Sequence, residues 1–206
     1  MNSITVIGLD LAGVSSRPSG FAVLNRKKIS TSLVHSDREI ISICINENPT
    51  TIAMDAPLSK PRKGGLRNCD RELIHRGLRV FPPLFGGMKK LTERGIKISK
   101  TLRSRGLKVI EIHPRTSGML LFGTPDRGLW VKKLKTLGYD LKTTETPHEI
   151  DAAIAALTGF LYLLGKSNEV GNPEKIIVPL PRSLDNISCS KRGSINLHSS
   201  AQPTRA

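Results

Sequence analysis

A hydrophobic run near the start of the chain ends in a carboxylate. Residues 4–9 (ITVIGL) have the apolar and β-branched composition of a buried strand, yet Asp10 follows at once and Gly13 closes the segment. The pattern recurs at 51–55 (TIAMD), where a second apolar run ends in Asp55. A buried, isolated carboxylate is costly unless it is neutralised. Two strands that both end in an aspartate therefore need a reason beyond packing.

Two further acids occupy comparable places: Glu111 lies within a predicted strand, and Asp151 lies in the second turn of a predicted helix. Clustered carboxylates become favourable when a cation lies among them, and Mg²⁺ prefers oxygen ligands. Two such ions about 3.5–4 Å apart can activate a water and stabilise the leaving oxygen of a phosphodiester. Asp10, Asp55, Asp151 and Glu111 are therefore the candidate catalytic residues and ligands for Mg²⁺ or Mn²⁺. Taken singly, the aspartates also suit ordinary turns and a helix start.

The remaining segments predict further strands and helices in a defined order. The final helix has the clearest start, because Thr146-Pro147-His148-Glu149 forms a capping box with proline at the first helical position. Pro114 is expected to end the predicted strand 108–113. The predicted strands are 4–10, 20–24, 28–34, 51–55 and 108–113, the first three forming a meander, and the predicted helices are 36–46, 69–75, 88–105, 126–137 and 147–164.

The charge of the chain is strongly positive and concentrated. The 206 residues carry a formal net charge of +15, with a pI near 10.2. Residues 60–108 contain fifteen Lys and Arg against three acids, a net +12. Such a balance predicts a polyanionic partner, nucleic acid first and an anionic membrane surface second. The residues expected to contact phosphate are Lys63, Arg67, Arg71, Arg76 and Arg79.

Several classes of protein are disfavoured by the sequence. Three widely spaced cysteines without a CxxC pair predict neither a disulfide framework nor a zinc site. The first residues do not resemble a signal peptide, and no apolar run is long enough to span a membrane, so a soluble, cytoplasmic protein is expected. Aromatic residues make up only 4 %, which argues against a base-stacking platform. The oligomeric state is left open, a homodimer being one option.

The order of acids and elements resembles the RNase H-like superfamily. The resemblance implies an α/β fold with a five-stranded mixed sheet flanked by helices, here with a basic helical insertion. The fragment 148–152 (HEIDA) resembles the late-helix motif of its resolvase-like nucleases. More narrowly, the chain is similar to the domain of unknown function 429 family, described as predicted nucleases. The pieces that carry this similarity are GLDLAG (8–13), MDAPLS (54–59), CDRELIHRGLRVFPP (69–83), GGMKKLTERG (86–95), VIEIHPR (109–115) and HEIDAAIAALTG (148–159).

The resemblance implies roles for single residues. Asp10 and Asp55 would be shared metal ligands, Asp151 would hold a second metal, and Glu111 is a candidate fourth ligand. The acid that the superfamily usually carries on its first helix is not evident, since only Glu39 and Glu47 are available there, and Asp70 and Glu72 are possible substitutes. His113 and His148 are candidates for assisting proton transfer.

The expected function is metal-dependent hydrolysis of phosphodiester bonds in structured DNA or RNA. One alternative is a non-catalytic, basic nucleic-acid-binding protein on the same fold. Another is an actin-like or sugar-kinase-type ATP-binding enzyme, which would need a glycine-rich phosphate loop where this chain has Asp55-Ala56-Pro57-Leu58. The expected organisation is one domain over 1–181, with the basic segment 60–108 inserted between the fourth and fifth strands, and a disordered tail over 182–206.

Overall fold

The computed structural model describes residues 4–141, 146–181, 183 and 184, and within them the chain forms a mixed eight-stranded sheet with six α-helices. The strands are β1 Thr5–Asp10, β2 Ser19–Asn25, β3 Lys28–Val34, β4 Thr51–Asp55, β5 Val109–Ile112, β6 Asp140–Leu141, β7 Ser167–Val170 and β8 Ile176–Pro179. The helices are α1 Asp37–Glu47, α2 Asn68–His75, α3 Gly87–Ser104, α4 Pro114–Phe122, α5 Arg127–Thr136 and α6 Pro147–Leu163.

The strand order is β6-β3-β2-β1-β4-β5-β8-β7, which places β1 inside the sheet. Strands β1, β2 and β3 form an antiparallel meander, whereas β4 pairs with β1 in parallel and β5 pairs with β4 in parallel. The parallel register brings Asp10 opposite Asp55. The carboxyl ends of β1 and β4 therefore meet at one edge of the sheet.

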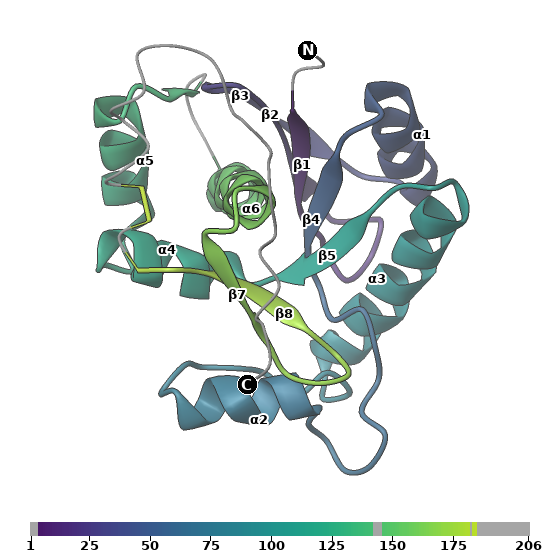
Figure 1. Cartoon of the computed structure of the whole chain (residues 1–206). Coiled ribbons are helices and arrows are strands. Elements are labelled where there is room, and N and C mark those ends of the chain that lie inside the picture. Colours follow the sequence, from purple (N-terminus) through teal and green to yellow (C-terminus); the bar gives the residue numbers. More distant parts are fainter. Residues whose placement is uncertain (1–3, 142–145, 182, 185–206) are drawn as a thin grey trace, which may run out of the picture.

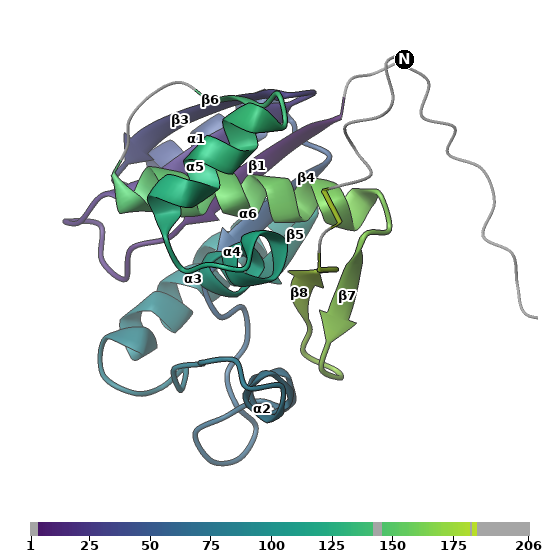
Figure 2. The same ribbon diagram turned by 90° about the vertical axis from the view of Figure 1, so that its left-hand side faces the viewer.

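Helices cover both faces of the sheet (Figure 1). Helix α6 lies across one face with α4 and α5 beside it, as the turned view also shows (Figure 2). Helices α1 and α3 cover the other face, where Ile40 and Cys44 of α1 and Ile98 and Leu102 of α3 join the apolar residues of the strands. The sheet is thus the middle layer of three.

The prediction of five strands is corrected to eight. The three additional strands extend the predicted sheet at its two edges, β6 beside β3 and β8 with β7 beside β5. Strand β6 has only two residues, and β7 (SNEV) is largely exposed, so neither shows the hydrophobic alternation of a strand. The apolar β8 is fully buried and pairs in parallel with β5.

Helix α4 follows directly after β5, where the sequence predicted only the end of a strand. Pro114 does end β5, but it also stands in the first turn of α4, a position for which its fixed φ is suited. Gly118 of α4 packs under Trp130, since a Cβ there would lie 2.3 Å from the indole ring. A short helix with an aromatic residue packed on its glycine carries little periodic signal in the sequence.

The basic segment 60–108 contains α2 and α3, and these two helices differ in role. Ile98 and Leu102 bury α3 in the core of the sheet, so α3 belongs to the main layer structure. Helix α2 packs through Cys69 and Leu73 against β7 and β8, on the side of the molecule toward which β1 and β4 run (Figure 1). The predicted tail lies almost wholly outside the described residues.

Candidate active site

Asp10 and Asp55 project from the ends of neighbouring strands toward the same helix. Gly8 of β1 contacts the backbone of α6, and Ala53 of β4 contacts Gly159 of that helix. Because side chains on a strand alternate between its two faces, Asp10 and Asp55 lie on the same face as Gly8 and Ala53. Both carboxylates therefore face the layer that contains α6.

Helix α6 approaches the sheet so closely that two strand positions have no room for a side chain. A Cβ on Gly8 would lie 2.0 Å from the carbonyl oxygen of Ala152, and one on Gly20 would lie 1.9 Å from that of His148. The capping box of Thr146 and Glu149 fixes where the helix begins. This close approach brings Asp151, which is buried, to the ends of β1 and β4.

Asp10 and Asp55 lie close enough to the other acids of the cluster for those charges to raise their pKa values. Burial raises the pKa of Asp55 well above its usual value, and the negative charges of Asp10 and Asp151 raise it further. Burial also raises the pKa of Asp10; a hydrogen bond from His148 opposes this rise and the charge of Asp151 adds to it. The side chain of Asp55 has no hydrogen bond or ion pair with any residue in the described ranges. The cluster thus holds more negative charge than its surroundings compensate.

Two protein groups partly neutralise the cluster. Nδ1 of His148 donates a hydrogen bond to Oδ2 of Asp10 over 2.7 Å. Arg127 donates two hydrogen bonds to Asp151, from Nε to Oδ1 at 2.8 Å and from Nη2 to Oδ2 at 2.6 Å. This contact raises the pKa of Arg127. The sequence pointed to His148 as a candidate but not to Arg127, because nothing in the spacing links the first turn of α5 to Asp151.

The donor set matches a hard divalent cation in its chemistry. Three carboxylates from two strands and one helix offer oxygen ligands of the kind that Mg²⁺ and Mn²⁺ prefer. As these side chains lie, no group of three or more described His, Cys, Asp or Glu residues is arranged to hold a metal ion. Asp10 and Asp151 are instead engaged by His148 and Arg127. Each Asp151 oxygen accepts one hydrogen bond from Arg127 and keeps a lone pair that a cation could use.

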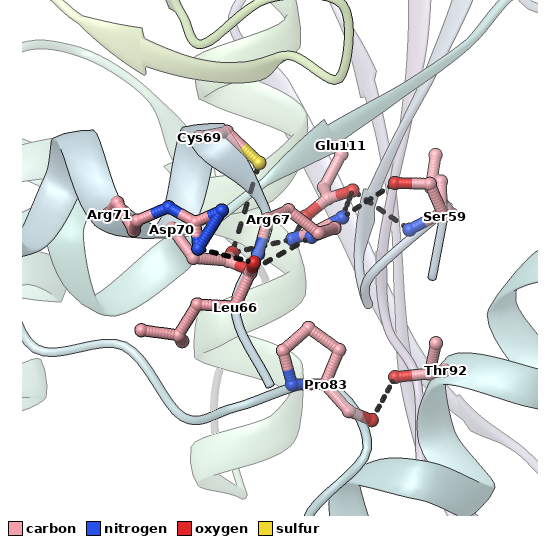
Figure 3. A network of polar contacts seen from close by, with 10 residues as sticks. Ser59, Leu66, Arg67, Cys69, Asp70, Arg71, Pro83, Thr92 and Glu111 are labelled. Atoms are coloured by element: carbon pink, nitrogen blue, oxygen red, sulfur yellow. Dashed lines mark hydrogen bonds and ion pairs between the residues drawn. The ribbon is translucent and has the colours of Figure 1, made fainter. Parts of the chain in front are cut away.

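Glu111, the fourth predicted ligand, lies on the opposite face of the sheet. Its neighbours Ile110 and Ile112 pack with Ala155 of α6, so the alternation of β5 directs Glu111 away from that helix. Both of its oxygens accept hydrogen bonds from Arg67, at 2.6 and 2.8 Å, and one also accepts from the backbone N–H of Leu58 (Figure 3). Burial raises the pKa of Glu111, although Arg67 opposes the shift. Glu111 is therefore not placed as a ligand beside the aspartates, although its negative charge also raises the pKa of Asp55.

Arg67 was expected to contact phosphate, but the structure buries it. Its five N–H groups are all used: two by Glu111, two by Asp70 and one by Ser59. Only 3 % of the residue is exposed. Arg67 thus ties α2 to β5 and has no donor left for a ligand. Because Asp70 is held in the same network, it is not a substitute metal ligand at the aspartate cluster either.

The other predicted phosphate contacts lie at the surface. Lys63, Arg71, Arg76 and Arg79 are all exposed. Arg76 pairs with Glu72, whose other oxygen accepts from the N–H of Gly171, whereas Arg71 donates to the carbonyl oxygen of Leu66. These four cations remain accessible to a polyanion.

His113, the second candidate for proton transfer, lies elsewhere. It precedes α4, and burial lowers its pKa to about 4. The charged groups that act on its pKa are Asp70 and Arg67, the buried ion pair that is joined to Glu111 of β5. Of the two predicted histidines, the structure brings only His148 to the aspartates.

Comparisons with known proteins give a distant structural likeness. The structure "T. thermophilus RuvC in complex with Holliday junction substrate" is 15 % identical with a TM-score of 0.49, covering 79 % of this chain and 96 % of that chain. A second structure of Thermus thermophilus RuvC is 13 % identical with a TM-score of 0.48, covering 85 % of this chain and 100 % of the other. No family model matches, so the resemblance to the domain of unknown function 429 family is not confirmed. No curated protein matches either.

None of the helices in the described ranges combines the length and the apolar character that a membrane crossing requires.

Proposed function

We propose that the chain is a divalent-metal-dependent phosphodiester hydrolase that acts on structured nucleic acid. The observation that carries the proposal is the convergence of Asp10, Asp55 and Asp151 from β1, β4 and α6, with the Asp55 carboxylate partly buried and without a hydrogen bond or ion pair to any described residue. Such an arrangement is unfavourable for folding alone, because burial and mutual repulsion both disfavour the charged forms. A cation bound among the three carboxylates would offset this repulsion and would account for the arrangement.

Asp10, Asp55 and Asp151 are the residues that would hold Mg²⁺ or Mn²⁺. The ion would supply an activated water at neutral pH and would neutralise charge that develops on the phosphate. His148 orients Asp10 through its hydrogen bond. Arg127 uses Nε and Nη2 on Asp151, while no described residue accepts from its Nη1, which is therefore available for a phosphate oxygen.

The arrangement of the strands supports an RNase H-like fold for this chain. The resemblance in the sequence implies an antiparallel meander followed by parallel strands, with the first aspartate on a central strand. The order β3-β2-β1-β4-β5 has this form, and β1 lies at its centre with Asp10 at its end. The strands β6, β7 and β8 extend this unit at its edges.

The test is cleavage of a panel of labelled substrates: a four-way junction, an RNA–DNA hybrid and a continuous duplex. We expect cleavage of at least one with Mg²⁺ or Mn²⁺ and none with EDTA. Asp10→Asn and Asp151→Asn should abolish cleavage while binding and the circular dichroism spectrum are retained. Asp140→Asn, an exposed acid on β6, is the matched control and should cleave normally. Cleavage that survives Asp10→Asn would refute the proposed site.

A non-catalytic nucleic-acid-binding protein is the second candidate. It is favoured by the engagement of Asp151 with Arg127 and of Asp10 with His148, which compensates part of the charge without a metal. This candidate predicts binding that is unaffected by EDTA, no stabilisation by Mn²⁺ and no cleavage of any substrate. The ATP-binding alternative has less support, because the N–H of Leu58 after β4 is used by Glu111 and Pro57 has none.

A further inference from the structure

Two phenylalanines are the most exposed large hydrophobic residues in the described ranges. Phe81 is 70 % exposed and Phe85 is 74 % exposed, and both lie in the loop between α2 and α3. Leu84, between them, is 38 % exposed, and Ile74 near the end of α2 is 42 % exposed. Exposed apolar groups gathered in one place mark a contact surface more often than an accident of packing. We call residues 81–85 (FPPLF) the aromatic loop.

The aromatic loop is held in a defined shape. Pro82 and Pro83 fix two of its φ angles, and the N–H of Phe85 donates to the carbonyl oxygen of Pro82 over 3.1 Å. The buried hydroxyl of Thr92 on α3 donates to the carbonyl oxygen of Pro83 over 2.7 Å (Figure 3). The two phenyl rings are thus presented from an anchored backbone, which reduces the entropy lost when a partner binds.

The surroundings of the loop are positively charged. Within the basic segment, the acids Asp70, Glu72 and Glu93 are each paired, with Arg67, Arg76 and Lys60 respectively. Exposed cations of the segment with no carboxylate partner in the described residues include Lys63, Arg71, Arg79, Lys89 and Lys90. This charge favours a polyanion over an apolar protein surface as the partner.

The aromatic loop also lies near the aspartates. Gly13 follows Asp10 by three residues and lies against the start of α3, with its Cβ position 3.5 Å from the carbonyl oxygen of Gly87. Arg94 of α3 reinforces this contact by donating to the carbonyl oxygen of Ala12 over 2.6 Å. Asp10 and Gly13 are three positions apart, and Phe85 and Gly87 are two positions apart. Because consecutive Cα atoms are about 3.8 Å apart, these two segments and the contact between Gly13 and Gly87 place the backbone of Phe85 within about 25 Å of Asp10. This is less than one turn of duplex DNA, about 34 Å.

We propose that Phe81 and Phe85 contact bases, so that the substrate class is nucleic acid with unpaired or unstacked bases, as at a junction, flap or bulge. Exposed lysines and arginines would hold the phosphates while the phenyl rings stack on, or wedge between, the opened bases. This inference rests on the nucleic-acid partner of the proposed function and adds the structural feature that the protein selects. Aromatic residues are scarce in the chain, but two of its five phenylalanines lie exposed in this one loop.

The test is binding without cleavage, measured by fluorescence anisotropy in EDTA. The probes are a continuous duplex and the same duplex carrying a bulge with 2-aminopurine at the unpaired position. The variants are Phe81→Ala, Phe85→Ala and the double variant, with Phe85→Trp as the conservative replacement. Ile45→Ala is the matched control, because Ile45 is an exposed apolar residue on α1, outside this surface.

We expect the wild type to prefer the bulged probe and to change its 2-aminopurine fluorescence. Each alanine variant should weaken binding to this probe by roughly five- to one hundred-fold while affinity for the continuous duplex changes little. Phe85→Trp and Ile45→Ala should bind as the wild type does. Equal affinity of the wild type and the double variant for the bulged probe would overturn the inference. If the double variant bound the probe as the wild type does but no longer self-associated, the loop would be a contact between copies of the chain, which would also overturn it. Because no cleavage is required, a failed nuclease assay leaves this result interpretable.

Discussion

Replacing Asp55 with asparagine should stabilise the metal-free protein and remove its response to Mn²⁺. The carboxylate of Asp55 is partly buried, has no described partner, and lies beside Asp10 and Asp151, so its ionised form is penalised in the folded state. Asparagine has nearly the same shape and no charge. The substitution therefore removes the repulsion and also removes a ligand for the metal.

The expected gain follows from the geometry of the sheet. Asp10 and Asp55 are register partners on neighbouring strands, which lie about 4.8 Å apart. Two carboxylates about 5–7 Å apart repel by about 2–3 kcal/mol at an effective dielectric constant of about 20. His148 and Arg127 relieve part of this repulsion, so we expect a gain of about 1–2 kcal/mol at neutral pH. For a domain of this size, that gain corresponds to an increase in Tm of about 2–8 °C.

The gain should depend on pH in a defined direction. Because folding raises the pKa of Asp55, this carboxyl binds a proton more readily in the folded protein than in the unfolded chain, and its contribution to stability falls as the pH rises above the ordinary value of 3.8. The advantage of Asp55→Asn should therefore be absent below pH 3.8 and present at neutral pH. Thermal unfolding followed by circular dichroism in EDTA, with Asp140→Asn as the control of equal charge change, measures it. A lower Tm for Asp55→Asn than for that control at neutral pH would refute the reasoning.

Three other substitutions test separate parts of the account. Arg67→Met should lower the free energy of unfolding in urea by about 3–5 kcal/mol, because the carboxylates of Asp70 and Glu111 stay buried without a cation; a loss below about 1 kcal/mol would contradict this. Gly8→Ala should cost about 1–3 kcal/mol and weaken Mn²⁺ binding, because its Cβ would displace α6 and with it Asp151; unchanged Mn²⁺ affinity in calorimetry would contradict this. Folding lowers the pKa of His113 from 6.5 to about 4, so the contribution of His113 to the free energy of unfolding should fall by about 3 kcal/mol as the pH falls through that window, and His113→Gln should remove that contribution in urea titrations. Equal pH profiles for both proteins would contradict the assignment to His113.

The sequence predicted well those elements whose signals are local. The helix predicted over 36–46 and the capping box at Thr146 correspond to α1 and α6, and the structure shows Ser36 and Thr146 as their N-caps. The apolar runs that end in Asp10 and Asp55 are the strands β1 and β4, and each ends at its aspartate as predicted. In each case, residues a few positions apart determine the local conformation, so the pattern is visible without knowledge of the fold.

Contacts between distant segments were not visible in the same way. All four residues of β5 are buried, so alternation between polar and apolar residues could not show which face Glu111 occupies. Arg67 and Glu111 are 44 positions apart, and Arg127 and Asp151 are 24 apart. From the sequence alone, an arginine in a basic segment is expected to be exposed to solvent or to bind phosphate, because its carboxylate partners cannot be identified. The burial of Arg67 therefore required the structure.

The most direct test of the central claim is calorimetric titration of Mn²⁺ into the wild type and into the Asp10→Asn/Asp55→Asn double variant. Each titration is made with the protein alone and with a four-way junction present, and circular dichroism confirms that the double variant is folded. The account predicts saturable binding to the wild type in at least one condition and none to the double variant. Absence of saturable binding to the wild type in both conditions, or equal binding to the double variant, would contradict a metal site formed by these aspartates.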